Sequence, residues 1–231
     1  MIPAKKNSII GSLFALYHNR LLRRHFYRIH LSGRENLAQA GKELPVILAA
    51  NHSNWWDGFI AYFLSNRLMK CDDYLMMDIK QMKKYSFFKY IGVFSVDRES
   101  PTEAIRSVNY AAEILKDSNR CLWIFPQGEM TPQDKRPLVF YSGISKIAER
   151  AGKVQIIPVA IRYEFLMEQR PEVFISIGSP VDFTAGNKNF TKELEQLMTK
   201  LLDNLKNDVT NGTGKLEIVF TGKSSRNKSF D

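Results

Sequence analysis

Apolar and polar positions follow two different periods along the chain, and each period predicts one kind of element. Short apolar runs closed by polar residues, glycine or proline are typical of buried strands. They lie at residues 44–50, 92–96, 121–125, 154–161 and 173–177, with an edge strand at 216–220. Apolar residues at helical spacing predict helices at residues 56–68, 101–116, 143–151 and 191–208. Because strands and helices alternate, we expect an α/β fold with a mostly parallel central sheet covered by helices.

The N-terminal segment has an amphipathic pattern of its own. Basic side chains flank a helical stripe of apolar residues formed by Ile9, Ile10, Leu13, Phe14, Tyr17, Leu21 and Leu22. The apolar stretch at residues 8–17 is about half as long as the roughly 20 residues that a spanning helix needs. A basic sequence follows it, where a signal peptide would have a small-residue cleavage site. Such a helix either lies in a membrane interface or packs on its own domain, and the pattern favours neither.

We therefore divide the chain into three parts. Residues 1–34 form a basic amphipathic, membrane-associating segment, residues 35–222 form the α/β domain that would carry the activity, and residues 223–231 form a disordered tail. The chain has 231 residues, 44% of them apolar, which is enough for a globular core and argues against wholesale disorder. Cys71 and Cys121 are too few for a disulfide framework and have no partner at metal-ligand spacing, so we expect a reducing compartment and no metal.

Charge is distributed unevenly. Lys and Arg outnumber Asp and Glu by 33 to 24, and residues 1–34 hold basic side chains but no acidic one. This bias indicates a polyanionic partner, either an anionic membrane surface or nucleic acid. A solvated basic face without any partner is the simpler alternative.

Candidate chemistry follows the first predicted strand. Ligands of parallel sheets bind beyond the carboxyl ends of the strands, so the residues there are the candidates. His52 comes directly after residues 44–50, and Asp57 lies five residues further on. A carboxylate that holds the Nδ1–H of an imidazole leaves the other ring nitrogen free to take a proton from a hydroxyl group. The spacing alone also arises by chance, and the position at a strand end is what gives it weight.

Two further strand ends carry unusual residues. Arg98 follows residues 92–96 and could bind a phosphate through a two-pronged contact, although a surface ion pair with Asp97 or Glu99 is the alternative. After the strand at 121–125 the polar loop contains Pro126, Gln127, Gly128 and Glu129. Its glycine lets the backbone approach a ligand closely, but a plain strand-ending turn would use the same residues.

These segments resemble a known family. The stretch N-H-S-N-W-W-D at residues 51–57 resembles the N-H-x4-D signature of the glycerophospholipid acyltransferases, the group that contains lysophosphatidic acid acyltransferase. Residues 92–98 resemble its second block, residues 125–129 its F-P-E-G-T-R block, and residues 156–160 its fourth, proline-containing block. All four occur in the expected order.

The resemblance implies an acyltransferase that moves a fatty acyl group from coenzyme A or acyl carrier protein to a lipid hydroxyl, with 1-acylglycerol-3-phosphate as the expected kind of acceptor. The thioester is a co-substrate, and no further cofactor is implied. Such an enzyme would act peripherally at the cytoplasmic face of a membrane. His52 would be the general base and Asp57 would orient it. The residues implied in substrate binding are Arg98, Pro126, Gln127, Gly128, Glu129, Asn51 and Trp55. Backbone N–H groups after Ser53 would stabilise the oxyanion.

The third block departs from the family pattern. The usual arginine is absent, because Met130 stands in its place and Glu129 precedes it. Arg98, or Lys135 and Arg136 a few residues on, would have to compensate. A neutral or sugar-bearing lipid hydroxyl is therefore an alternative acceptor.

Two other function classes remain as alternatives. A non-catalytic module would bind nucleic acid or anionic lipid through its basic surface, where Lys and aromatic residues are interleaved at residues 83–90. It would need neither His52 nor Asp57. A hydrolase would use His52 to activate water, but the chain has no G-x-S-x-G nucleophile elbow. We therefore favour the acyltransferase and expect no nucleic-acid partner.

Overall fold

The computed structural model describes residues 1–38, 42, 44–116 and 118–225, and the part of the expected tail at residues 226–231 lies outside them. The strands are β1 (Arg28–Ser32), β2 (Val46–Ala50), β3 (Asp73–Asp78), β4 (Val93–Val96), β5 (Cys121–Ile124), β6 (Gln155–Glu164), β7 (Glu172–Ile177), β8 (Val181–Asp182) and β9 (Glu217–Thr221). The α-helices are α1 (Ser8–His25), α2 (Arg34–Ala38), α3 (Asp57–Phe63), α4 (Ile79–Lys84), α5 (Pro101–Leu115), α6 (Gly143–Ala151) and α7 (Phe190–Asn211). A π-helical turn, η1 (Leu64–Met69), extends α3, and a 3-10 helix, η2 (Ser86–Ile91), follows α4.

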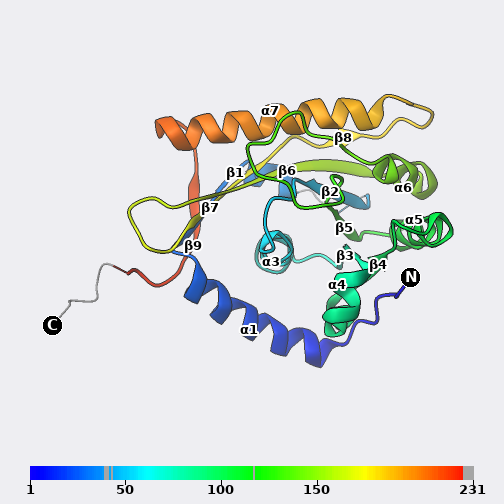
Figure 1. Ribbon diagram of the computed structural model, residues 1–231, viewed down its shortest axis with the longest axis horizontal. Coiled ribbons are helices and arrows are strands. Elements are labelled where there is room, and N and C mark those ends of the chain that lie inside the picture. Colours follow the sequence, from blue (N-terminus) through cyan, green and yellow to red (C-terminus); the bar gives the residue numbers. More distant parts are fainter. Residues whose placement is uncertain (39–41, 43, 117, 226–231) are drawn as a thin grey trace.

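The described strands form one mixed sheet in the order β4-β3-β5-β2-β6-β7-β1-β9, with β8 paired to β6 (Figure 1). Pairing is parallel from β4 to β6 and between β7 and β1. It is antiparallel between β6 and β7, β6 and β8, and β1 and β9. The expected α/β fold with a mostly parallel central sheet is confirmed, and β9 is an edge strand as expected.

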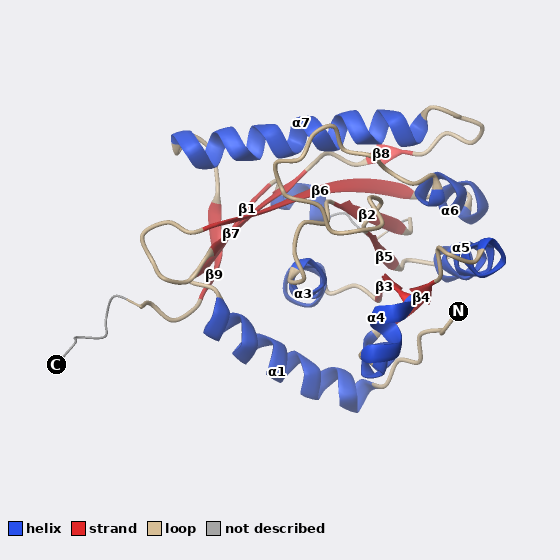
Figure 2. Cartoon of the chain, in the orientation of Figure 1, coloured by secondary structure: helices blue, strands red, loops and turns tan. Residues whose placement is uncertain are grey.

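Helices cover both faces of the sheet (Figure 2). Because successive side chains of a strand point to opposite faces, β2 contributes to two separate cores. Ile47 and Ala49 pack in the core beneath α5, α6 and α7, whereas Val46, Leu48 and Ala50 pack in the core beneath α3. A strand that is buried on both faces leaves only its carboxyl end to face a ligand, and the loop after β2 begins there.

The sequence pattern missed β1 and β3. In β1 the residues alternate between buried and partly exposed, since Arg28, His30 and Ser32 separate Ile29 from Leu31. The strand lies in the sheet between β7 and β9, so the α/β domain begins before residue 35 and the expected boundary is wrong at that point. Every residue of β3 is only partly buried, and its apolar run is only four residues long between the aspartates that begin and end it.

Helix α1 packs on its own domain, which is one of the two arrangements that its sequence allows. Phe14, His18 and Leu22 are buried against the domain, and the Phe14 ring meets the ring of Tyr62 edge-on with centroids 4.9 Å apart. Another face of the helix exposes the apolar residues Ile9, Leu13, Leu16 and Tyr17. Among the described helices, none combines the length and the apolar character needed to cross a bilayer.

The buried His18 makes the docking of α1 sensitive to pH. Its Nε2 lies 2.9 Å from the carbonyl oxygen of Phe59 in α3. Burial lowers the pKa of His18 to about 4; the Phe59 carbonyl partly offsets this effect, and Arg67 adds to it. An unfolded histidine keeps its ordinary pKa of about 6.5, so between these two values the unfolded chain binds more protons than the folded one.

We therefore predict that stability falls as the pH falls from 6.5 to 4, the range set by the two pKa values of His18. The loss assigned to this side chain is roughly 2–3 kcal/mol in the free energy of unfolding. Urea unfolding of the wild type and of His18→Gln over this pH range measures it, because glutamine does not titrate. Parallel pH curves for the two proteins would contradict the prediction.

Candidate active site

His52 and Asp57 form the centre of the candidate site. His52 lies in the loop that follows β2, and Asp57 is the first residue of α3. The Nδ1 atom of His52 is 2.8 Å from Oδ2 of Asp57. Asp57 is fully buried, whereas 22% of the His52 side chain is exposed. The Phe125 ring stacks on the imidazole with centroids 4.5 Å apart. The expected pairing of these two side chains is present in the structure.

The Asp57 carboxylate is held by donors from two segments of the chain. Oδ2 also accepts hydrogen bonds from the backbone N–H groups of Ser53 and Asn54, both at 2.8 Å. Oδ1 accepts one from the Tyr163 hydroxyl at 2.7 Å. A buried carboxylate is strongly destabilising unless such donors replace water. Because a carboxylate only accepts, the Nδ1 of His52 donates to it and Nε2 is left as the acceptor.

Tyr163 is a site residue that the sequence did not indicate. It belongs to β6, beyond Ile161, where the apolar run predicted the strand to end. Burial raises the pKa of Tyr163 well above its usual value, and the adjacent Asp57 raises it further, so the hydroxyl stays a donor. The bonds to Asp57 also correct our expectation for the oxyanion. The N–H groups of Ser53 and Asn54 are already used by the carboxylate.

Asn51 and Gln127 position the His52 loop and do not contribute to the cavity wall. Asn51 is buried, and its amide pairs with both the backbone N–H and the carbonyl of Ile161. The Gln127 carbonyl Oε1 accepts from the His52 backbone N–H at 2.7 Å, and its amide donates to the Thr131 hydroxyl. Thr131 in turn donates its backbone N–H to the His52 carbonyl at 2.9 Å. These bonds hold the His52 loop in place, and substrate binding by Asn51 and Gln127 stays a prediction.

Gly128 and Arg98, two of the substrate-binding candidates predicted from the sequence, lie next to each other. Its φ is +73°, and a Cβ at this position would lie 2.7 Å from Arg98 Nη1 and from the Tyr141 ring. Arg98 extends Nη2 to within 3.6 Å of the Asp78 carboxylate and lies over the Tyr141 ring. The alternative pairing of Arg98 with its neighbour Glu99 does not occur, because Glu99 pairs with Lys80. Tyr141 is a second residue that the sequence did not indicate.

A cavity of about 620 Å³ opens beside His52, and its walls differ in character. Aromatic and aliphatic side chains from α1, α3, β3 and η2 form one wall: Phe14, Trp55, Phe59, Tyr62, Leu75, Met76, Met77 and Phe88. Met76 and Met77 line this space and also pack against the buried clusters. Trp55 lines it as expected, and so do Pro126 and Gly128, whereas Glu129 is exposed and is not among the lining residues.

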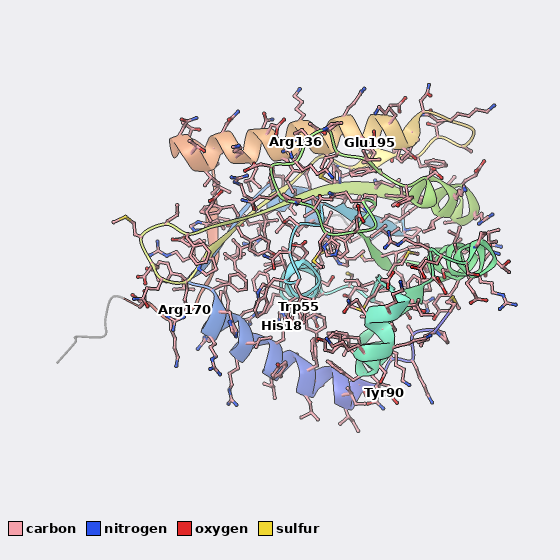
Figure 3. The ribbon with its side chains drawn as sticks, in the orientation of Figure 1. His18, Trp55, Tyr90, Arg136, Arg170 and Glu195 are labelled. Carbon is pink, nitrogen blue, oxygen red and sulfur yellow. The ribbon has the colours of Figure 1, made fainter. Side chains whose placement is uncertain are left out.

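Basic side chains form another wall of the same cavity. Arg98 contributes from the loop after β4, and Lys146 and Arg150 contribute from α6, one turn apart. Both α6 residues are exposed, and neither forms an ion pair with any residue in the described part of the chain. Met130, at the position of the missing family arginine, lines the cavity as well. The expected substitute Arg136 points elsewhere, because it pairs with Asp203 of α7 at 2.6 Å (Figure 3).

The aromatic residues of segment 83–90 do not form a surface for stacking bases. Tyr85 and Phe88 line the cavity, and Phe88 is buried in a cluster with Phe14 and Phe59. Phe87 is exposed, but its ring packs on Phe88 with centroids 4.3 Å apart. The segment therefore offers no observation in favour of nucleic-acid binding.

Comparisons with known proteins indicate the family. The model of the family described as Acyltransferase matches residues 28–162. The 1-acyl-sn-glycerol-3-phosphate acyltransferase of Streptococcus pneumoniae is 27% identical over 162 residues, which is 67% of this chain and 57% of that protein. The protein of the same name from Saccharomyces cerevisiae is 29% identical over 137 residues, covering 58% and 42%. The chain thus spans about half the length of these relatives.

A solved structure shows the same fold. The 1-acyl-sn-glycerophosphate acyltransferase of Thermotoga maritima superimposes with a TM-score of 0.63 at 20% identity, covering 84% of this chain and 79% of that one. At this level of identity the likeness establishes the fold alone.

Proposed function

Because the chain belongs to the acyltransferase family, we propose that it transfers a fatty acyl group from an acyl thioester to the hydroxyl group of a lysophosphatidate-type lipid. The observation that carries this proposal is the buried Asp57 carboxylate holding His52 at the edge of a cavity with an apolar and a basic wall. The two relatives named above bear an activity of this kind in their names. The acyl donor is coenzyme A or acyl carrier protein.

His52 acts as the general base of the transfer. Its Nε2 takes the proton of the acceptor hydroxyl as the hydroxyl oxygen attacks the thioester carbonyl carbon. The tetrahedral intermediate then breaks its carbon–sulfur bond, and the leaving thiolate takes the proton back from the imidazolium. Asp57 stabilises that imidazolium through the Nδ1 hydrogen bond, and general-base catalysis of this type contributes roughly 10²–10⁴-fold. A thiolate leaves readily, so the mechanism needs no covalent enzyme intermediate.

The aromatic wall takes the acyl chain. Burial of each methylene group contributes about 0.8 kcal/mol, so an apolar wall binds a long chain without any polar contact. The rings of Phe14, Phe59 and Phe88 belong to one cluster, so α1, α3 and η2 shape this wall jointly. Because Phe14 comes from α1, the docking of that helix completes the chain-binding wall.

The basic wall takes the acceptor's phosphate. A phosphate dianion pairs best with arginine and lysine side chains that are not already neutralised. Arg98 is held by Asp78 and Tyr141, and Lys146 and Arg150 have no described ion-pair partner. These two side chains of α6 replace the arginine that Met130 displaces. Phosphate binding by these two residues could not be predicted from the sequence, because cations on an amphipathic helix are usually solvated.

The exposed face of α1 binds the membrane that supplies the acceptor. Ile9, Leu13 and Leu16 project from this helix, and the exposed Arg20, Arg23 and Arg24 follow along it. Apolar burial and attraction to anionic headgroups then act on one helix. The enzyme would accordingly be a peripheral protein of the cytoplasmic membrane face.

His52→Ala should reduce acyl transfer by at least about 10²-fold, because it removes the proton acceptor while leaving the fold intact. Transfer is measured as acylated product formed from an acyl thioester and lysophosphatidate, and the unfolding midpoint serves as the folding control. A variant that keeps most of the wild-type rate would refute the assignment of the base.

Lys146→Gln combined with Arg150→Gln should raise the KM for lysophosphatidate about tenfold, because two charge-assisted contacts to phosphate are lost. The KM for the phosphate-free monoacylglycerol should not change. Lys200→Gln, an exposed cation on α7, is the matched control. If the double variant raised only the KM of the thioester donor, the basic wall would bind the donor's phosphates and the proposal for the acceptor would be wrong.

A further inference from the structure

The loop between β6 and β7 presents an apolar tip to solvent. Phe165, Leu166 and Met167 are 72%, 53% and 73% exposed. Three consecutive large apolar side chains exposed to this degree are unfavourable in water unless another surface covers them. In Figure 1 this loop projects beyond the ends of β6 and β7, near the end of α1 that leads into β1.

The base of this loop is tied to the C-terminal end of α1. Arg170 donates from Nε to the carbonyl of Arg24 at 2.7 Å and from Nη1 to the carbonyl of Lys223 at 2.9 Å. The backbone N–H of Tyr27 donates to the carbonyl of Pro171 at 3.1 Å. Figure 3 shows Arg170 beside that end of the helix. The tip is therefore held at a fixed place relative to the exposed face of α1.

The acidic side chains next to the tip are ion-paired or buried, whereas several basic side chains near the base of the loop are exposed. Glu164 forms an ion pair with Arg162 at 2.5 Å. Glu168 is buried and accepts hydrogen bonds from the Ser224 hydroxyl at 2.8 Å and the Ser225 backbone N–H at 2.6 Å. Exposed cations lie at the two segments to which the base of the loop is tied, namely Arg23, Arg24 and Lys223. An apolar tip with cations beside its base matches an anionic lipid surface, which offers acyl chains beneath negative headgroups.

We propose that Phe165, Leu166 and Met167 form a second membrane anchor, which inserts into an anionic bilayer beside α1. This inference rests on the proposed function in one respect, namely that the acceptor is a membrane lipid. Two separate anchors restrict the tilt of the domain relative to the bilayer more than a single interfacial helix does. Since α1 also contributes Phe14 to the cavity, the restricted tilt keeps the apolar wall next to the bilayer.

The test compares vesicle binding by the full chain and by a tip variant, Phe165→Ser with Leu166→Ser and Met167→Ser. Vesicles contain equal parts of phosphatidylglycerol and phosphatidylcholine. We expect the tip variant to bind at least about tenfold more weakly, at low and at high salt alike, because salt does not screen apolar insertion. The matched control is Val139→Ser with Leu197→Ser, which removes exposed apolar side chains elsewhere and should bind as the wild type does.

Acyl transfer to a short-chain acceptor dissolved as monomers separates this inference from the proposed function. The tip variant should keep the wild-type rate there, because the tip does not line the cavity. Equal vesicle affinity of the wild type and the tip variant would overturn the second anchor, and so would an equal loss in the control variant. A wild type that transfers no acyl group would refute the proposed function, while the vesicle comparison would still decide the anchor.

Discussion

A buried carboxylate organises this molecule around its candidate site. Asp57 has no contact with water, so its charge has to be met by hydrogen-bond donors from the protein. Those donors come from the loop after β2 and from Tyr163 in β6, and a third segment joins them through Gln127, which braces the His52 backbone. The requirement to satisfy one carboxylate thus draws three strand ends together. It also fixes the imidazole, because the same Oδ2 atom that binds two backbone N–H groups accepts the His52 Nδ1 proton.

The cavity beside this imidazole is chemically asymmetric, and the asymmetry fits the two halves of the proposed substrates. Its aromatic wall depends on α1, which docks through the neutral, buried His18, and its basic wall depends on α6 and Arg98. The apolar and the basic side chains named above come from different elements, as the proposed places for an acyl chain and a phosphate require. Helix α1 takes part both in the cavity and in the proposed membrane contact. One of its faces completes the cavity, and another is exposed and free to contact a lipid surface.

How much of this the sequence could predict depends on where each interaction originates. Strands with continuous apolar runs, such as β2 and β5, were predicted, and the bounds of α6 agree with the structure at both ends. The strands β1 and β3 were missed, because polar residues alternate with apolar ones in β1 and the apolar run of β3 is short and only partly buried. His52 and Asp57 could be found because both follow one strand locally. Tyr163 and Tyr141 could not, since their roles arise only when distant segments pack together. Asn51 and Gln127 were found in the right loops, but their contacts to the His52 loop were not, because sequence does not show which way an amide points.

The most direct measurement of the central claim is acyl transfer by Asp57→Asn next to the wild type, with the acylated lipid and free fatty acid quantified separately. Asparagine keeps the size of the side chain and an oxygen that can accept the backbone N–H groups, but it removes the charge that stabilises the imidazolium. The account predicts that the wild type acylates the lipid and that the variant is slower by roughly 10²–10⁴-fold with the fold retained. Equal rates in the two proteins, or a wild type that releases only free fatty acid, would contradict it.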